Sequence, residues 1–152
     1  MGAGGRARRH RQVLREAGHR VVASDIIHRD FELDFQADFL TVTKAPAGVE
    51  AICTNPPFKN AGEFARHALD LAPRVYLLLR LSFLESVSRT DILEHSGLAT
   101  VHVFRNRLPM LHRDGWAGPR ARNSVAFAWL VWDRGHVGPA IFNHISWTAD
   151  AS

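Results

Sequence analysis

The chain has 152 residues, of which 46% are hydrophobic and 22% charged, close to ordinary globular usage, so it can bury a core as one domain over residues 1–152. It has no apolar run long enough for a transmembrane helix and no secretory signal, and we expect a cytoplasmic protein, monomeric by default, without a membrane partner. The single cysteine, Cys53, excludes an internal disulfide and a cysteine-based zinc cluster.

The hydrophobic pattern predicts alternating helices and strands after a largely irregular start over residues 1–11. Short β-branched runs indicate buried strands, and apolar residues three or four apart indicate helices. Gly18 is expected to end the first helix. In chain order we expect a helix over about 9–17, a strand over 21–27, a loop or one helical turn over 28–38, a strand over 51–54, a helix over 61–71, a strand over 75–81, a helix over 89–95, and strands over 100–105, 124–132 and 140–147.

This order predicts an α/β fold. Strands that alternate with helices form a parallel sheet joined by right-handed crossovers. The last strands follow one another with little helix between them, which favours an antiparallel C-terminal edge on a mostly parallel sheet. No internal repeat or linker indicates a second domain.

The most informative feature is the tetrad Asn55-Pro56-Pro57-Phe58, directly after the strand over 51–54. Two successive prolines exclude helix and ladder pairing and hold the backbone in an extended turn. The carboxyl end of a parallel strand is where open α/β sheets bind ligands. A purely structural Pro-Pro turn is the alternative interpretation.

The tetrad has the groups that N-methylation needs. The side-chain carbonyl of Asn55 and the backbone carbonyl of Pro56 can accept hydrogen bonds from an amino group, and Phe58 offers a flat face for a base. Two acceptors that pull on the amino hydrogens favour the nucleophilic, tetrahedral form of the nitrogen. Catalysis then rests on positioning and electrostatics, without an acid or base residue close by.

The run Thr54–Phe58 resembles the amino-methyltransferase motif of class I S-adenosylmethionine-dependent enzymes, especially DNA N6-adenine methyltransferases. The resemblance implies a Rossmann-like three-layer α/β/α sandwich, S-adenosylmethionine as cofactor, and methyl transfer to an exocyclic amino group, adenine N6 in DNA. It further implies that Asn55 lies against the cofactor as well as the substrate. The segments 115–119 and 124–132 are similar to the C-terminal part of small phage- and prophage-type methyltransferases.

Two acids upstream match the family by order and spacing. Asp25, followed by Ile26, looks like the acid that binds the ribose hydroxyls of the cofactor, and Asp38-Phe39 looks like the next motif, which contacts the adenine of the cofactor. A carboxylate at the end of a parallel strand can accept both hydroxyls of a ribose. The alternatives are a loop cap or an arginine pair for Asp25, and a turn acid for Asp38.

The resemblance covers about residues 12–147 and departs from the family at the start. Family members begin with a strand that ends in an acid, followed by a Gly-rich loop that grips the cofactor. Here no apolar strand precedes the first helix, and the glycines of Gly2–Gly5 follow no strand. We therefore expect a truncated start, with the first strand and loop missing or degenerate, and weak or absent cofactor binding by the chain as given.

Charge points to a polyanionic partner. Residues 1–20 hold six arginines against one acid, and residues 105–122 hold five against one. Such clusters neutralise phosphates and release counterions, although a solvated basic surface has the same composition. None of the nine histidines has the spacing of a metal-binding pair, so no metal is expected. The candidate contacts to nucleic acid are Lys59, Arg113, Trp116, Arg120 and Arg122.

Three alternatives to a DNA methyltransferase stay open. RNA methylases and enzymes that methylate a protein glutamine use a similar Asn-Pro-Pro turn, so DNA, with RNA as a second possibility, is the expected partner rather than the established one. A catalytically dead remnant that binds nucleic acid by charge is the third alternative.

Overall fold

The computed structural model describes residues 3–26, 33–108 and 125–146, with side chains from His10 onward. The described residues form two compact units. The N-terminal unit runs up to Val42, and the sheet unit begins at Thr43. Each is described by itself below.

The N-terminal unit begins with helix α1 (Ala3–Glu16). Gly18, at φ 89°, ends it as predicted. The amide of Gly18 donates to the Arg15 carbonyl at 2.9 Å, and that of His19 to the Leu14 carbonyl at 3.0 Å, the two bonds of a Schellman cap. The expectation of an irregular start over residues 1–11 is wrong from Ala3 onward, because alanine and arginine are strong helix formers that outweigh the glycines.

Two very short strands follow in the same unit. β1 (Ser24–Asp25) pairs in parallel with β2 (Phe35–Gln36). The expected buried strand over 21–27 is therefore wrong in length and burial: Val22 is 39% and Ile26 56% exposed. Among the described residues β1 pairs with no strand other than β2, so the apolar residues on either side of β1 lie outside a larger sheet. The segment expected as a loop over 28–38 contains β2.

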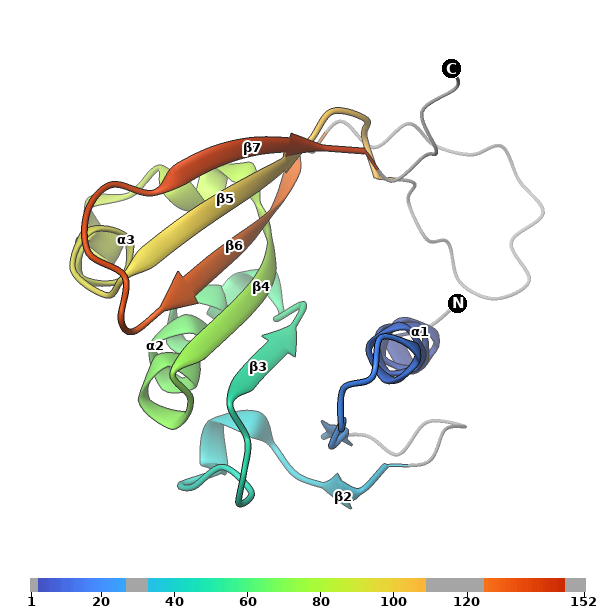
Figure 1. Ribbon diagram of the computed structural model, residues 1–152. Coiled ribbons are helices and arrows are strands. Elements are labelled where there is room, and N and C mark those ends of the chain that lie inside the picture. Colours follow the sequence, from blue (N-terminus) through green and yellow to red (C-terminus); the bar gives the residue numbers. More distant parts are fainter. Residues whose placement is uncertain (1–2, 27–32, 109–124, 147–152) are drawn as a thin grey trace. The chain divides into compact units, whose positions relative to one another are not determined.

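The sheet unit contains most of the predicted elements (Figure 1). The strand expected over 51–54 and the helix expected over 61–71 have the bounds predicted for them, and the other elements of this unit differ from prediction by a few residues at their ends. Their observed bounds are β3 (Ala51–Thr54), α2 (Ala61–Leu71), β4 (Arg74–Arg80), α3 (Thr90–Glu94), β5 (Leu98–Phe104), β6 (Phe127–Asp133) and β7 (Ile141–Ile145).

The five strands lie in the order β3-β4-β6-β5-β7. β3 is parallel to β4 and β7 to β5, while β6 is antiparallel to both of its neighbours. Four strands thus run in one direction, as expected of a mostly parallel α/β sheet compatible with a Rossmann-like fold. The expected antiparallel edge is wrong in position: β6 lies inside the sheet, and the edge strand β7 is parallel. β6 is almost wholly apolar, which suits a strand that is paired along both of its edges, whereas the edge strand β7 carries polar residues.

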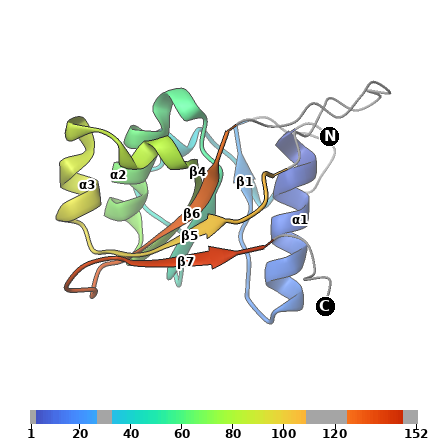
Figure 2. The ribbon, with the colours of Figure 1, turned by 90° about the horizontal axis from the view of Figure 1, so that it is seen from above.

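The core lies on the face of the sheet that α2 and α3 cover (Figure 2). The indole N–H of Trp132 donates to the Ile92 carbonyl of α3 at 2.7 Å and joins helix to sheet. The second helix layer of the expected three-layer sandwich is not found among the described residues of this unit, because two successive right-handed crossovers in one direction place both helices on one face. The buried strand residues of this face are Val75, Leu77, Leu79, Leu98, Val101, Ala128, Leu130 and Trp132.

Within the described ranges, no helix is both long and apolar enough to span a membrane.

Candidate functional site

The tetrad forms a rigid corner at the carboxyl end of β3. Asn55 is half-buried and Pro56 is buried, while Pro57 has an extended backbone with φ −56° and ψ 131°. The Pro57 carbonyl accepts the amide of Asn60 at 3.1 Å, which starts the 3₁₀ turn over Phe58–Asn60 and leads into α2. The predicted sequence of strand, double-proline turn and helix is confirmed. The backbone of the corner is therefore fixed by β3 before it and by the 3₁₀ turn after it.

The acceptors proposed for an amino group lie in this fixed segment. No hydrogen bond to the Pro56 carbonyl is found among the residues that the structure describes. Asn55 holds its amide at the junction between strand and turn, half shielded from water. Because partly desolvated acceptors bind a donor more strongly than solvated ones, this position suits the recognition of an amine.

Phe58 presents its ring at the surface. It is 46% exposed, so part of the ring is open to solvent. The guanidinium carbon of Arg80 lies over the ring, 4.0 Å from its centroid, and the ring of Phe127 is 5.8 Å away at an angle of 46°. Arg80 ends β4 and stands opposite Phe127 of β6 in the antiparallel ladder. Pairing of β4 with β6 therefore brings these two side chains to the Phe58 ring.

A second arginine fixes the loop that follows Arg80. Arg89 donates from Nε to the Phe83 carbonyl at 2.8 Å and lies over the ring of Phe83, 4.5 Å from its centroid. Phe83 is itself buried. The amide of Leu81 donates to the Ala126 carbonyl at 2.9 Å. The backbone at Arg80 is thus held in two ways: by the pairing of β4 with β6 and by the hydrogen bonds of the loop that follows it.

Sequence reasoning missed Arg80, Arg89 and Phe127. Each is remote from the tetrad in the chain, and only the register of β4 against β6 brings Arg80 and Phe127 together. The available signal was weak: Arg80 is the one charge in an otherwise apolar strand end, Leu77–Leu81. A cation at the carboxyl end of a strand next to the tetrad is a reasonable site candidate.

The two acids predicted to bind the cofactor lie together in the N-terminal unit. The amide of Ala37 donates to the backbone carbonyl of Asp25 at 3.1 Å, so Asp38 follows directly at the carboxyl ends of β1 and β2. Asp38 Oδ1 accepts the amide of Leu40 at 3.1 Å and caps a 3₁₀ turn, the role of a turn acid. Ile26 is exposed and Phe39 half-buried.

Of the predicted nucleic-acid contacts, Lys59 is exposed in the 3₁₀ turn after the double proline. The other four, Arg113, Trp116, Arg120 and Arg122, lie outside the described residues. Within the described ranges, no group of three or more histidine, cysteine or acidic side chains is placed to hold a metal ion.

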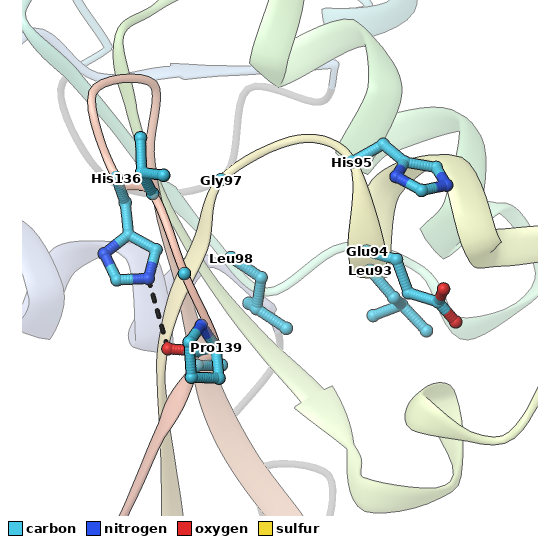
Figure 3. Close-up of a pocket in the computed structure, with 10 residues that line it drawn as sticks. Leu93, Glu94, His95, Gly97, Leu98, His136 and Pro139 are labelled. Carbon is cyan, nitrogen blue, oxygen red and sulfur yellow. Dashed lines mark hydrogen bonds between the residues drawn. The ribbon is translucent and has the colours of Figure 1, made fainter.

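A separate pocket of about 450 Å³ lies at the opposite edge of the sheet (Figure 3). It is bordered by the end of α3, the start of β5 and the turn between β6 and β7. His136 Nε2 lies 3.3 Å from the Pro139 carbonyl across this turn. His95 and Glu94 line the pocket, and no residue of the tetrad does. It lies at the amino ends of the parallel strands, away from the corner.

No protein-family model matches the chain, and a search of curated proteins finds no match either.

Proposed function

We propose that the chain transfers a methyl group from S-adenosylmethionine to an exocyclic amino group, adenine N6 in DNA, within a class I methyltransferase fold. The observation that carries the proposal is the corner Asn55–Phe58. It follows a parallel strand, it is held by the double proline, and it presents an exposed ring beside two carbonyl acceptors.

The residues act by positioning. Asn55 and Pro56 accept hydrogen bonds from the two amino hydrogens, which draws the nitrogen lone pair out of conjugation with the ring of the base. Phe58 stacks on that ring and fixes the plane of the amine. With S-adenosylmethionine bound, the amino nitrogen would take its methyl group, the C–S electron pair would stay on sulfur, and the nitrogen would lose one proton to solvent water. The bound cofactor supplies the electrophilic methyl group.

The acids of the N-terminal unit fit the cofactor chemically. Asp25 is half-buried at the end of β1, and ionised carboxylates accept hydrogen bonds from a pair of ribose hydroxyls. Asp38 uses one oxygen for its cap and retains acceptor capacity on the carboxylate. The adjoining Ile26 and Phe39 supply apolar surface for the adenine.

DNA is favoured as substrate by the charge of the chain and by the exposed ring. Phe58 offers a stacking face, and Lys59 follows it directly with an exposed cation. A target adenine in a duplex has to leave the helix to reach the corner, so single-stranded DNA is the easier substrate. RNA and protein glutamine are the other acceptors to compare.

Labelled S-adenosylmethionine offered with single-stranded DNA, duplex DNA, RNA and a glutamine peptide tests the proposal. We expect label on adenine in DNA when S-adenosylmethionine is supplied at a concentration high enough to offset the weak cofactor binding expected from the sequence. Asn55→Ala should lower the methylation rate about a hundredfold or more, the effect of losing one pre-positioned hydrogen-bonding group at the reacting atoms.

Asn60→Ala is the matched control. Asn60 lies five residues further on, and its side chain makes no capping hydrogen bond to α2. We expect its rate to stay within a few fold of the unchanged protein. Equal rates for the two variants, or label on none of the four acceptors, would remove the basis of the proposal.

A further inference from the structure

The stack of Arg80 on Phe58 conflicts with the use of that ring as a base platform. The guanidinium carbon lies over the ring, 4.0 Å from its centroid, in cation–π contact with one face. A base cannot occupy the same face of the ring while the guanidinium lies there. The tilted ring of Phe127, 5.8 Å away, also borders Phe58. Substrate binding on the covered face therefore requires Arg80 to move.

Arg80 is held loosely enough to move. Among the described residues it forms no ion pair, unlike Arg66 and Arg74, which pair with aspartates. The contact of a cation with an exposed aromatic ring is weak. The side chain can leave the ring while its backbone stays fixed by the ladder to Phe127.

The substrate supplies a better partner for the displaced cation. Every nucleotide carries a phosphate beside its base, and an arginine binds phosphate through charge-assisted, bidentate hydrogen bonds that are stronger than a cation–π contact. A base that takes the ring brings its own phosphate to the region that the guanidinium has left. A glutamine side chain or a free base brings no such anion.

Resting on the proposed function, we propose that Arg80 is a substrate-binding residue that exchanges the Phe58 ring for the phosphate next to the target adenine. The exchange couples two events, stacking of the base and capture of its phosphate. It makes a nucleic-acid strand the substrate class of this corner, in preference to a peptide glutamine.

A short single-stranded DNA with one adenine tests the exchange by fluorescence anisotropy. The same strand is prepared with an uncharged methylphosphonate in place of the phosphate next to that adenine. We expect the unchanged protein to bind the modified strand about tenfold more weakly, the range for a hydrogen bond to a charged group. Arg80→Gln should bind both strands equally and lower the slope of log affinity against log salt by about 1.

Arg74→Gln is the matched control, because Arg74 stands at the other end of β4 and pairs with Asp133. It should keep the full preference for the natural strand. If Arg80→Gln retains that preference, or if the unchanged protein has none, Arg80 does not bind this phosphate. The binding assay does not depend on methyl transfer. A methylating protein with no phosphate preference therefore refutes the Arg80 inference alone, whereas a preference without methylation of any acceptor refutes the proposed reaction.

Discussion

Cys53 lies two residues before Asn55, and the reactivity of its thiol depends on how far the fold buries this end of β3. Burial raises the pKa of this thiol to about 11, although the residue as a whole, on the edge strand β3, is exposed. The thiolate is the form that reacts with alkylating reagents. A raised pKa also means that the folded state favours the neutral thiol, so its contribution to stability is present below pH 9 and is lost as the pH rises toward 11.

We therefore expect slow alkylation of Cys53 by iodoacetamide in the folded protein. The rate at pH 8 should be at least about tenfold lower than in denatured protein, because a shift of one pKa unit already lowers the thiolate fraction about tenfold. It should climb through pH 10 to 11, where the denatured protein has already reached its plateau. Mass spectrometry of timed samples measures both rates. Equal rates at pH 8 would contradict the raised pKa.

The sequence predicts some residues of the candidate site and not others. The corner Asn55–Phe58 was predicted because its chemistry is local: two prolines fix their own backbone in any context. Arg80 was not predicted, because its contact to Phe58 depends on where β4 ends relative to β6. The roles of Asp25 and Asp38 stay predictions, since their case rests on order and spacing, and the structure adds that they lie together.

Elements with local signals were predicted best. Helix α2 begins and ends where its apolar spacing and Pro73 indicate, and the strands of the sheet unit follow the apolar runs. The place of β6 between β4 and β5 was not predicted, because hydrophobic patterns mark a strand without naming its neighbours. The long expected strand over 21–27 failed for the same reason: a β-branched run becomes a buried strand only where other strands cover it.

Gly97 lies where the start of β5 contacts the end of β6, and its replacement by alanine tests how closely the two backbones are packed there. It precedes β5 with φ 73°, and a Cβ placed there would clash with the Asp133 carbonyl oxygen at the end of β6. The Gly97 carbonyl also accepts the Asp133 amide at 3.0 Å, so the two backbones cannot separate without loss of that bond. Gly97→Ala should therefore lower the free energy of unfolding by more than backbone strain alone explains.

Gly48→Ala is the comparison for this prediction. Gly48 has φ 81°, but nothing lies within 4 Å of its added Cβ, so strain of about 1–2 kcal/mol is the whole expected loss. Urea unfolding of both variants should show a clearly larger loss for Gly97→Ala, by about 1 kcal/mol or more. Similar losses would mean that the β5 and β6 ends relax freely around the new methyl group.

The sequence predicts the elements of the sheet unit better than those of the N-terminal unit. Fold class could be read from the alternation of strands and helices, which describes the sheet unit well. The same reading assigned residues 21–27 to that sheet, whereas β1 pairs only with β2 among the described residues. Local patterns predict the elements but not the unit to which each belongs, because that depends on partners distant in sequence.

Amide hydrogen exchange should separate the two units. In the sheet unit, β4 and β6 are each paired on both sides, and Val75, Leu77 and Leu130 are fully buried, so their amides exchange only on global unfolding. β1 and β2 are two residues long, and two-stranded pairs have little stability of their own. We expect amides of β1 and β2 to exchange about a hundredfold faster or more, since local opening needs far less free energy. Equal protection would instead show that the segments around Asp25 and Asp38, the acids proposed to bind the cofactor, are held as rigidly as the sheet.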